Sequence, residues 1–291
     1  MTTISNVPIT NWSQKCSPAI QEQALRALEE VSVLFFPQLG FSIEEVEGRL
    51  LSPTIAGKSK NVSFDISTGK LRGSNVGEAE IRLLQSMMRR FATCSNDLLF
   101  NLLPHYNAGL VQSRTSFRPV EIAERRTSWR KDDTRLHVDS FPSTPVQDRR
   151  ILRVFSNVNP HGKSRFWRLG ESFESVASHY LSSLSGPVWG VSQLLRLCRI
   201  TKSRRSAYDH FMLQIHDRMK ADLDYQLKAD QIDCEFPAGS TWITYTDQVS
   251  HAAMAGQYCL EQTFYLPVTF MQDPSRAPLR ILERLMGRNL T

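Results

Sequence analysis

The pattern His137-Val138-Asp139, together with a distant His251, constrains the fold of this chain more than any other feature. On an extended strand, side chains i and i+2 point to the same face, so His137 and Asp139 can approach one ion while Val138 points away. A 2-His-1-carboxylate set holds Fe(II) on one face and leaves positions open for a co-substrate and O₂. The third ligand must come from another strand, so folding has to bring two distant segments together.

The sequence around His251 favours this interpretation. Residues 236–251 predict a turn, a strand rich in β-branched and aromatic residues, and a loop. A second strand is predicted over 258–268, so His251 would lie between two paired strands near the mouth of a barrel. A role without metal stays open for both parts of the pattern, because a His-x-Asp pair is common in surface loops and a histidine before a strand is commonly a hydrogen-bonded polar residue.

The central part of the chain has the pattern of a β-protein with a helical insertion. Short, turn-bounded strands are predicted over 120–123, 136–139, 151–158 and 165–169. Strands resume at Ile232, and several short strands at this spacing predict a sandwich or barrel. Helical periodicity from Phe173 to about Leu227, broken at Ser185-Gly186-Pro187, predicts an insertion that covers the barrel mouth.

The two ends of the chain are predicted to be mainly helical. Helices are expected over 19–36, 41–51 and 77–103, with a strand and turn over 62–72. In the tail, apolar residues at helical spacing alternate with Arg276, Arg280, Arg284 and Arg288. This basic amphipathic helix either docks on its own domain or contacts a membrane surface.

Composition narrows the class of protein. The 291 residues, 41% of them hydrophobic, suffice for one large barrel domain with helical additions or for two small domains. Five scattered cysteines without a C-x-x-C spacing argue against a disulfide framework or zinc ribbon and favour a reducing compartment. Neither a signal-peptide pattern nor an apolar run near the ~20 residues of a membrane span is visible. We therefore expect a cytoplasmic protein.

The charge of the chain favours an anionic partner, because the formal net charge is +6. Basic residues cluster before the His-x-Asp pair, at Arg125, Arg126, Arg130, Lys131 and Arg135, and again at Lys202, Arg204 and Arg205. A single cluster of this kind is more commonly a solvated face than a binding site. No RNP, C₂H₂ or basic-zipper motif is present, so nucleic acid is not expected.

Three longer stretches, Ser116–Pro119, Ser128–Ser143 and Arg150–Pro160, resemble one known family. Shorter matches occur at 51–53, 64–65, 167–171 and 261–267, and the run from Lys131 to Asp139 is the most specific. The chain resembles the Kdo hydroxylases, Fe(II)/2-oxoglutarate dioxygenases that hydroxylate 3-deoxy-D-manno-oct-2-ulosonic acid (Kdo), a sugar of the lipopolysaccharide inner core.

The resemblance implies a single dioxygenase domain over residues 1–291, of the α+β or mainly β class. Its core would be a double-stranded β-helix, the jelly-roll or cupin-like fold. The expected parts are an N-terminal helical region (1–115), the β-helix core (116–172 and 231–272), a helical insertion (173–230) and a C-terminal helix (273–291).

The resemblance also implies that His137, Asp139 and His251 bind the iron, with 2-oxoglutarate and O₂ as co-substrates. Many members of the wider superfamily have an Arg or Lys about ten residues after the distal His, which binds the C5 carboxylate of 2-oxoglutarate. This chain has Glu261-Gln262-Thr263 there, so another cation must bind that carboxylate.

The strand after the His-x-Asp pair offers the candidates Arg149, Arg150 and Arg153, with Thr134 as a helper. Because side chains alternate along a strand, Arg153 shares a face with Ile151, Phe155 and Asn157, and Arg150 lies on the opposite face. We take Arg153 as the first candidate.

The implied substrate is Kdo in a lipopolysaccharide precursor of the Kdo–lipid A type, and the products are the 3-hydroxylated sugar, succinate and CO₂. Arg130, Lys131 and Arg135 are candidates to bind this acidic substrate. A lipid-linked substrate implies peripheral contact with the cytoplasmic face of the inner membrane, and the tail arginines Arg280, Arg284 and Arg288 predict salt-sensitive binding to anionic vesicles. The alternatives are another 2-oxoglutarate hydroxylase, acting on a protein or small molecule, and a non-catalytic sugar- or lipid-binding barrel.

Overall fold

A computed structural model describes residues 2–123, 125 and 127–291 of the chain. The strands are β1 Thr3–Asn6, β2 Ser32–Phe36, β3 Val62–Asp65, β4 Lys70–Arg72, β5 Val111–Arg118, β6 Arg149–Asn157, β7 Arg165–Leu169, β8 Ile232–Phe236, β9 Thr241–Tyr245, β10 His251–Ala255 and β11 Cys259–Pro267. The α-helices are α1 Pro18–Glu29, α2 Glu78–Leu102, α3 Phe173–Tyr180, α4 Val191–Leu197, α5 Ala207–Ala221, α6 Leu223–Lys228 and α7 Pro278–Met286.

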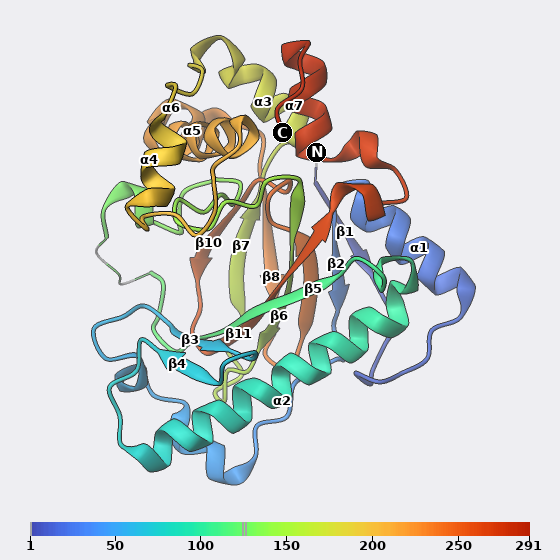
Figure 1. Cartoon of the computed structure of the whole chain (residues 1–291). Coiled ribbons are helices and arrows are strands. Elements are labelled where there is room, and N and C mark those ends of the chain that lie inside the picture. The colour runs from blue at the N-terminus through green and yellow to red at the C-terminus, as the bar shows by residue number, and fades with distance from the viewer. Residues whose placement is uncertain (1, 124, 126) are drawn as a thin grey trace.

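The strands form a mixed α/β structure with two sheets (Figure 1). The large sheet has eight strands in the order β1-β2-β9-β6-β11-β5-β3-β4, and the small sheet has the order β10-β7-β8. All strand pairs among the described residues are antiparallel except β1 with β2. A single backbone bridge between His137 and His251 adds the His-x-Asp segment to the edge of the small sheet.

An aromatic cluster joins the two sheets. Phe155 and Trp242 come from the large sheet and stack with ring centroids 5.2 Å apart, and Phe236 of the small sheet stacks on Trp242 at 4.1 Å. Trp167, also from the small sheet, packs edge-on against Phe155 at 5.0 Å. Buried aromatic pairs of this geometry contribute about 0.5–1.5 kcal/mol each beyond their burial. The cluster therefore holds the sheets together immediately beside the segment that contains His251.

Helices cover the sheets in two groups. In Figure 1, α1 and α2 lie along the large sheet, where α1 contacts β2 and α2 contacts β5 and β11. The apolar side of α2, which includes Leu84, Met88 and Phe91, is fully buried, and this confirms the helix predicted over 77–103. The second group contains α3, α5, α6 and α7 above the sheets, with α4 at its edge. The predicted helical insertion is thus present as α3 to α6.

The predicted helix over 19–36 is wrong in its second half. Helix α1 ends at Glu29, and Val31 adopts a φ of 70°, a left-handed conformation that no helix continues through. Residues Ser32–Phe36 then form β2, which lies between β1 and β9. The helix expected over 41–51 is also shorter, a 3₁₀ helix at Glu45–Leu50.

Two predicted strands near the His-x-Asp pair also differ. Residues 120–123 form a turn, in which a Glu121 side-chain oxygen accepts hydrogen bonds from the amides of Ile122 and Gly256. Residues 136–139 contain one bridge residue instead of a full strand. Strand β11 pairs with the predicted β6 on one side and, on the other, with β5, which the sequence did not predict.

The C-terminal helix docks on the domain. Its apolar residues Leu279, Ile281 and Leu282 are buried, and α7 contacts α3. Arg280 and Arg284 pair with Glu283 and Glu174. The docked-helix interpretation of the tail is therefore confirmed, and contact of its arginines with a membrane surface stays a prediction. No described helix has the length and hydrophobicity that crossing a membrane requires.

Candidate metal centre

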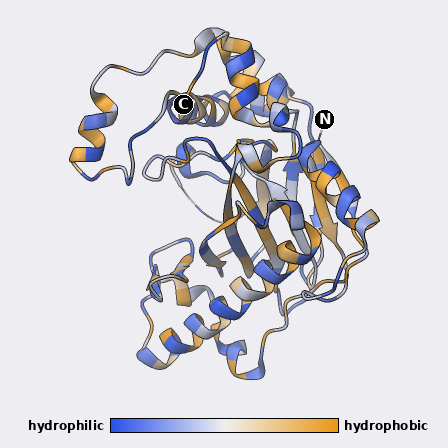
Figure 2. Ribbon diagram, turned by 45° about the vertical axis from the view of Figure 1, so that its right-hand side comes forward, coloured by the Kyte–Doolittle hydropathy of each residue, from blue (hydrophilic) through white to orange (hydrophobic). Residues whose placement is uncertain are grey.

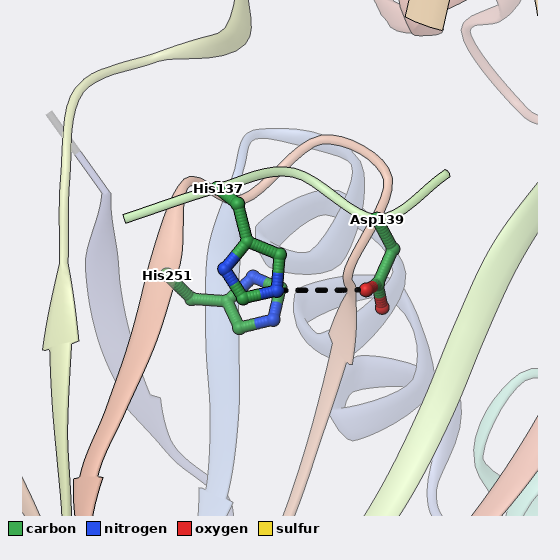
Figure 3. Close-up of side chains that lie close together, drawn as sticks. All are labelled: His137, Asp139 and His251. Atoms are coloured by element: carbon green, nitrogen blue, oxygen red, sulfur yellow. Dashed lines mark ion pairs between the residues drawn. The ribbon is translucent and has the colours of Figure 1, made fainter. Parts of the chain in front are cut away.

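Backbone pairing brings the three predicted ligands together. The amide of His137 donates to the carbonyl of His251 at 3.0 Å, and the reciprocal bond is 2.9 Å. The amide of Asp139 donates to Thr246 O at 2.7 Å, which fixes the carboxylate beside the two rings. One ligand atom from each of the three side chains lies within 4.8 Å of the others, and Figure 3 shows the side chains converging.

Both imidazoles are oriented as metal ligands. His137 Nδ1 lies 2.8 Å from Arg135 O, and His251 Nδ1 lies 2.8 Å from Val249 O. A carbonyl oxygen can only accept, so Nδ1 is protonated and the Nε2 lone pair is free. Burial lowers the pKa of both histidines, which keeps the rings neutral and able to bind a metal.

Asp139 is an ionised carboxylate in a buried position. Burial opposes ionisation, but the Arg153 guanidinium holds the pKa of the Asp139 carboxyl well below its usual value. Arg153 Nη1 lies 3.2 Å from Asp139 Oδ2, an oxygen without a hydrogen-bond donor among the described residues. Two neutral imidazoles and one carboxylate form the donor set that non-heme Fe(II) takes, so the residues present fit this ion.

A cavity of about 1030 Å³ opens over the three ligands. Its walls come from both sheets, from the segment after Asp139, and from helix α5 of the insertion. Among the described residues, the walls contain four carboxylates but eleven Lys and Arg side chains, at positions 60, 114, 118, 130, 131, 153, 165, 202, 205, 218 and 220. The cavity is therefore strongly basic and suits a ligand with several negative charges.

Two buried carboxylates fix the arginines nearest the metal centre. Glu261 accepts a hydrogen bond from Arg118 Nε at 2.9 Å and lies 3.2 Å from Arg153 Nη1. Although burial opposes it, these guanidinium groups lower the pKa of Glu261. Asp133 pairs with Lys60 at 2.9 Å and also with Arg118 and Arg125. Glu261 occupies the neighbourhood where many superfamily members have a cation, and its role here is to position cations.

Three donors beside the metal centre lack an acceptor. Arg153 Nε, Arg165 Nε and Trp167 Nε1 are buried without a hydrogen-bond partner among the described residues, and all three side chains line the cavity. Trp167 also stacks on the His251 ring, with centroids 5.2 Å apart. Each unsatisfied buried donor costs about 1–3 kcal/mol. A ligand bound in the cavity can supply the acceptors that these three donors lack.

The structure separates the candidates for 2-oxoglutarate binding. Arg153 lines the cavity, as its strand face predicted. Arg150 lies on the other face of β6, fully buried, with Nε 2.7 Å from Asp247 Oδ2, so it cannot serve as a cavity residue. Arg149 stacks over Tyr265, outside the cavity lining. The Thr134 hydroxyl donates to Asp132 at 2.6 Å and does not reach the cavity either.

The structure also separates the three residues that were candidates for substrate binding. Arg130 and Lys131 line the cavity, whereas Arg135 donates to Lys220 O at 2.6 Å and pairs with Asp132. Arg126 lies outside the described residues. Sequence reasoning missed the contributions of β5, α5 and β7. Only the contribution of β7 had a signal in the sequence, because Arg165 and Trp167 alternate within a predicted strand and so share one face.

Comparisons with known proteins identify one family. The family model for 3-deoxy-D-manno-oct-2-ulosonic acid (Kdo) hydroxylase matches residues 11–289. The chain is similar to crystal structures of the Kdo hydroxylase KdoO, a non-heme Fe(II) alpha-ketoglutarate dependent dioxygenase. The complex with alpha-ketoglutarate and Fe(III) is 46% identical, with a TM-score of 0.96 over 99% of this chain and 97% of that one. The succinate and Fe(III) complex is 47% identical, with a TM-score of 0.95 over the same shares. No curated protein matches the chain.

Proposed function

Because the chain belongs to the Kdo hydroxylase family, we propose that it hydroxylates Kdo on a lipid-linked substrate of the Kdo–lipid A type, at carbon 3. The enzyme is an Fe(II)/2-oxoglutarate-dependent dioxygenase, with O₂ as second co-substrate. One observation in the site supports this assignment above the others. Two pre-oriented histidines and a carboxylate lie beside three buried donors without acceptors, in a strongly basic cavity.

The two sheets suit a double-stranded β-helix core. The small sheet, extended by the His137–His251 bridge, faces the large sheet across the aromatic cluster, with the metal centre at one end. We assign one dioxygenase domain to residues 1–291, in which the insertion 173–230 lines the cavity through α5.

In this assignment His137, Asp139 and His251 hold the iron. When bound, the iron couples the decarboxylation of 2-oxoglutarate to hydroxylation of the sugar. The chain contributes fixed tautomers through Arg135 O and Val249 O, and a carboxylate that Arg153 keeps ionised. These partners orient the ligands before the metal arrives.

Arg153 and Arg165 are the residues that we assign to the carboxylates of 2-oxoglutarate, with the Trp167 indole N–H as a further donor. A guanidinium offers a planar pair of N–H groups that matches a carboxylate, which a lysine would not reproduce. Glu261 holds Arg153 and Arg118 in place, so the site is rigid before the co-substrate binds. Rigid donors cost less to order on binding.

The outer part of the cavity suits the substrate. Kdo has a carboxylate, and a lipid A-type substrate adds phosphates. Among the described residues, Arg114, Lys131 and Lys202 line the cavity without a carboxylate within ion-pair distance. Uncompensated cations attract and orient such a polyanion. We place the enzyme at the cytoplasmic face of the inner membrane, where this substrate would be anchored.

A coupled assay tests the proposal. Purified protein with Fe(II), 2-oxoglutarate and O₂ should form succinate faster when Kdo–lipid A is added, and mass spectrometry should find one added oxygen atom on Kdo. Oxygen added to another compound, with Kdo untouched, would favour the different-hydroxylase alternative. Succinate formation no faster than in a protein-free control, from iron-loaded protein, would favour the non-catalytic barrel.

A further inference from the structure

The segment between α3 and α5 exposes an unusual run of large apolar side chains. The exposed fractions are 71% for Val188, 94% for Trp189, 58% for Leu194, 80% for Leu197 and 58% for Ile200. None of the residues of α4 is buried. Single exposed apolar residues are normal on a protein surface, but a contiguous run of them marks a contact surface.

This segment differs from α7, the basic amphipathic helix of the tail. The apolar side of α7 is packed against the domain, with Leu279 and Leu282 almost fully buried. Figure 2 shows α4, with its largely hydrophobic residues, standing apart from the body of the helical group. The basic tail therefore has no free apolar face, whereas α4 has one.

Cations surround the apolar residues of α4. Arg196, Arg199, Lys202 and Arg204 are all exposed, and none of them forms an ion pair with a described residue. An exposed tryptophan, leucines and unpaired arginines in one short segment are the combination found at a membrane interface, where the apolar groups enter the acyl boundary and the cations meet anionic headgroups. No acidic residue occurs between Gly186 and Arg205, so the whole segment is positively charged and matches an anionic lipid surface.

The segment is fixed to the wall of the catalytic cavity. The amide of Lys202 donates to Ser143 O at 3.0 Å, and Arg205 Nη2 donates to Pro142 O at 2.8 Å. Pro142, Lys202 and Arg205 all line the cavity. The apolar run therefore ends beside the part of the cavity wall that contains Pro142, three residues after the ligand Asp139.

We propose that residues 188–200 insert their apolar side chains into the surface of an anionic phospholipid bilayer and so hold the cavity over a lipid-anchored sugar. This inference rests on the lipid-linked substrate proposed above. It assigns membrane contact to α4 and its flanks, in place of the tail arginines.

Vesicle binding by the full-length protein tests the assignment directly. The substitutions Trp189→Ser, Leu194→Ser and Leu197→Ser, made together, should weaken sedimentation with phosphatidylglycerol-containing vesicles at least about tenfold, because they remove the apolar area that enters the lipid. The matched control combines Val46→Ser and Phe100→Ser, which are 60% and 59% exposed in the 3₁₀ helix Glu45–Leu50 and in α2. Equal binding by the α4 variant and the control would overturn the proposal.

Tryptophan fluorescence reports the position of Trp189 itself. Anionic vesicles should shift the emission of the wild type to shorter wavelength, and Trp189→Phe should lose that shift while it still sediments with vesicles. A shift of equal size in Trp189→Phe would place Trp189 outside the lipid and contradict the proposal. If the α4 variant instead converts a dimer to a monomer in size-exclusion chromatography without lipid, a second copy of the chain is the occupant and the proposal fails.

Activity on two substrates separates this proposal from the function on which it rests. The α4 variant should lose kcat/KM for Kdo–lipid A in vesicles but keep wild-type kcat/KM for a water-soluble, delipidated Kdo oligosaccharide. Equal loss on both substrates would overturn the role of α4. A wild type that binds vesicles through α4 but hydroxylates neither substrate would contradict the proposed function and leave the surface assignment supported.

Discussion

Strand β6 has two buried arginines on opposite faces, and their surroundings differ. Arg150 is fully buried, with Nε 2.7 Å from Asp247 Oδ2, a further bond to Gln248, and its guanidinium 3.9 Å from the Tyr245 ring centre. Arg153 is 7% exposed and faces the cavity, and its Nε has no acceptor among the described residues. The Arg150 guanidinium is hydrogen-bonded within the protein, whereas Arg153 keeps one N–H group without an acceptor among the described residues.

The difference shows how one strand can serve stability on one face and binding on the other. Where the protein supplies the acceptors, the arginine is part of the core. Where a buried donor is left over, the protein bears a cost that a ligand can remove. Burial raises the pKa of Asp247 despite the neighbouring guanidinium, so desolvation is not fully offset even in the well-bonded pair. The two faces should therefore respond in opposite ways to substitution.

The largest effect is expected at the metal centre on the cavity face. Asp139→Ala should abolish turnover, because it removes the one anionic ligand of the set. The fold should survive, with the unfolding free energy within about 1 kcal/mol of wild type, since Arg153 keeps its ion pair with Glu261 when the Asp139 carboxylate is removed. Succinate formation and urea unfolding measure the two quantities. Wild-type turnover in this variant would refute the assignment of the metal ligands.

On the opposite face, Arg150→Ala should lower the unfolding free energy by about 3–5 kcal/mol, because Asp247 is left buried without its partner. Replacing both residues, with Arg150→Met and Asp247→Leu, should cost less than either single substitution to Ala. Urea unfolding measures the effect, and the KM for 2-oxoglutarate of the folded protein should stay unchanged. A stability loss below about 1 kcal/mol would remove the contrast between the two faces.

The period of two along a strand places Arg153 and Arg150 on opposite faces and favours Arg153 as the cavity residue. The same period predicts that His137 and Asp139 share a face. The strands β6, β7, β9 and β11 have enough β-branched and aromatic residues to be predicted from the sequence alone.

The elements that the sequence did not predict, β5, β2 and the α5 wall of the cavity, also have a physical explanation. Strand β5 was not predicted because its cavity-facing side chains, such as Arg114 and Ser116, are polar, so the apolar alternation of a core strand is absent. Strand β2 follows α1 after only two residues, and a continuous apolar run there matches helix and strand equally. The α5 wall of the cavity depends on contacts between residues far apart in the chain, which no local pattern encodes.

A third test concerns Arg153, whose Nε–H group lacks an acceptor among the described residues. Arg153→Ala should raise the KM for 2-oxoglutarate about 30- to 100-fold, equivalent to the 2–3 kcal/mol of a charge-assisted hydrogen bond. Arg153→Lys should recover only part of this loss, because an ammonium cannot reproduce the planar pair of donors. Steady-state kinetics at saturating substrate give the values. An unchanged KM in Arg153→Ala would move the assignment to Arg165.

Asp133 lies between the cases of Arg153 and Arg150. It lines the cavity, as Arg153 does, but it is paired within the protein, as Arg150 is. Burial opposes its ionisation, yet Arg118 and Lys60 hold its pKa below the unfolded value of about 3.9. Its contribution to stability is therefore present above pH ~4 and lost as the pH falls below it. Asp133→Asn should cost about 2 kcal/mol at neutral pH. The two unfolding curves should converge in acid, and a constant difference between pH ~6 and ~2 would contradict this account.

The smallest effect is expected at Arg149, which shares the odd-numbered face with Arg153 but lies at the start of β6. Its guanidinium stacks over the ring of Tyr265 at 5.1 Å and its Nε donates to Val146 O at 3.1 Å, so both contacts are made within the protein, and Arg149 itself does not line the cavity. Arg149→Ala should leave the KM for 2-oxoglutarate unchanged and lower the unfolding free energy by less than about 1 kcal/mol, the usual range for a cation–π contact that is still partly solvated. The comparison is strict, because Arg149 and Arg153 are the same residue type on one face of one strand and differ in whether they reach the cavity. A tenfold rise in KM for Arg149→Ala would mean that position on the strand, and not a buried donor without an acceptor, identifies the residue that binds the co-substrate.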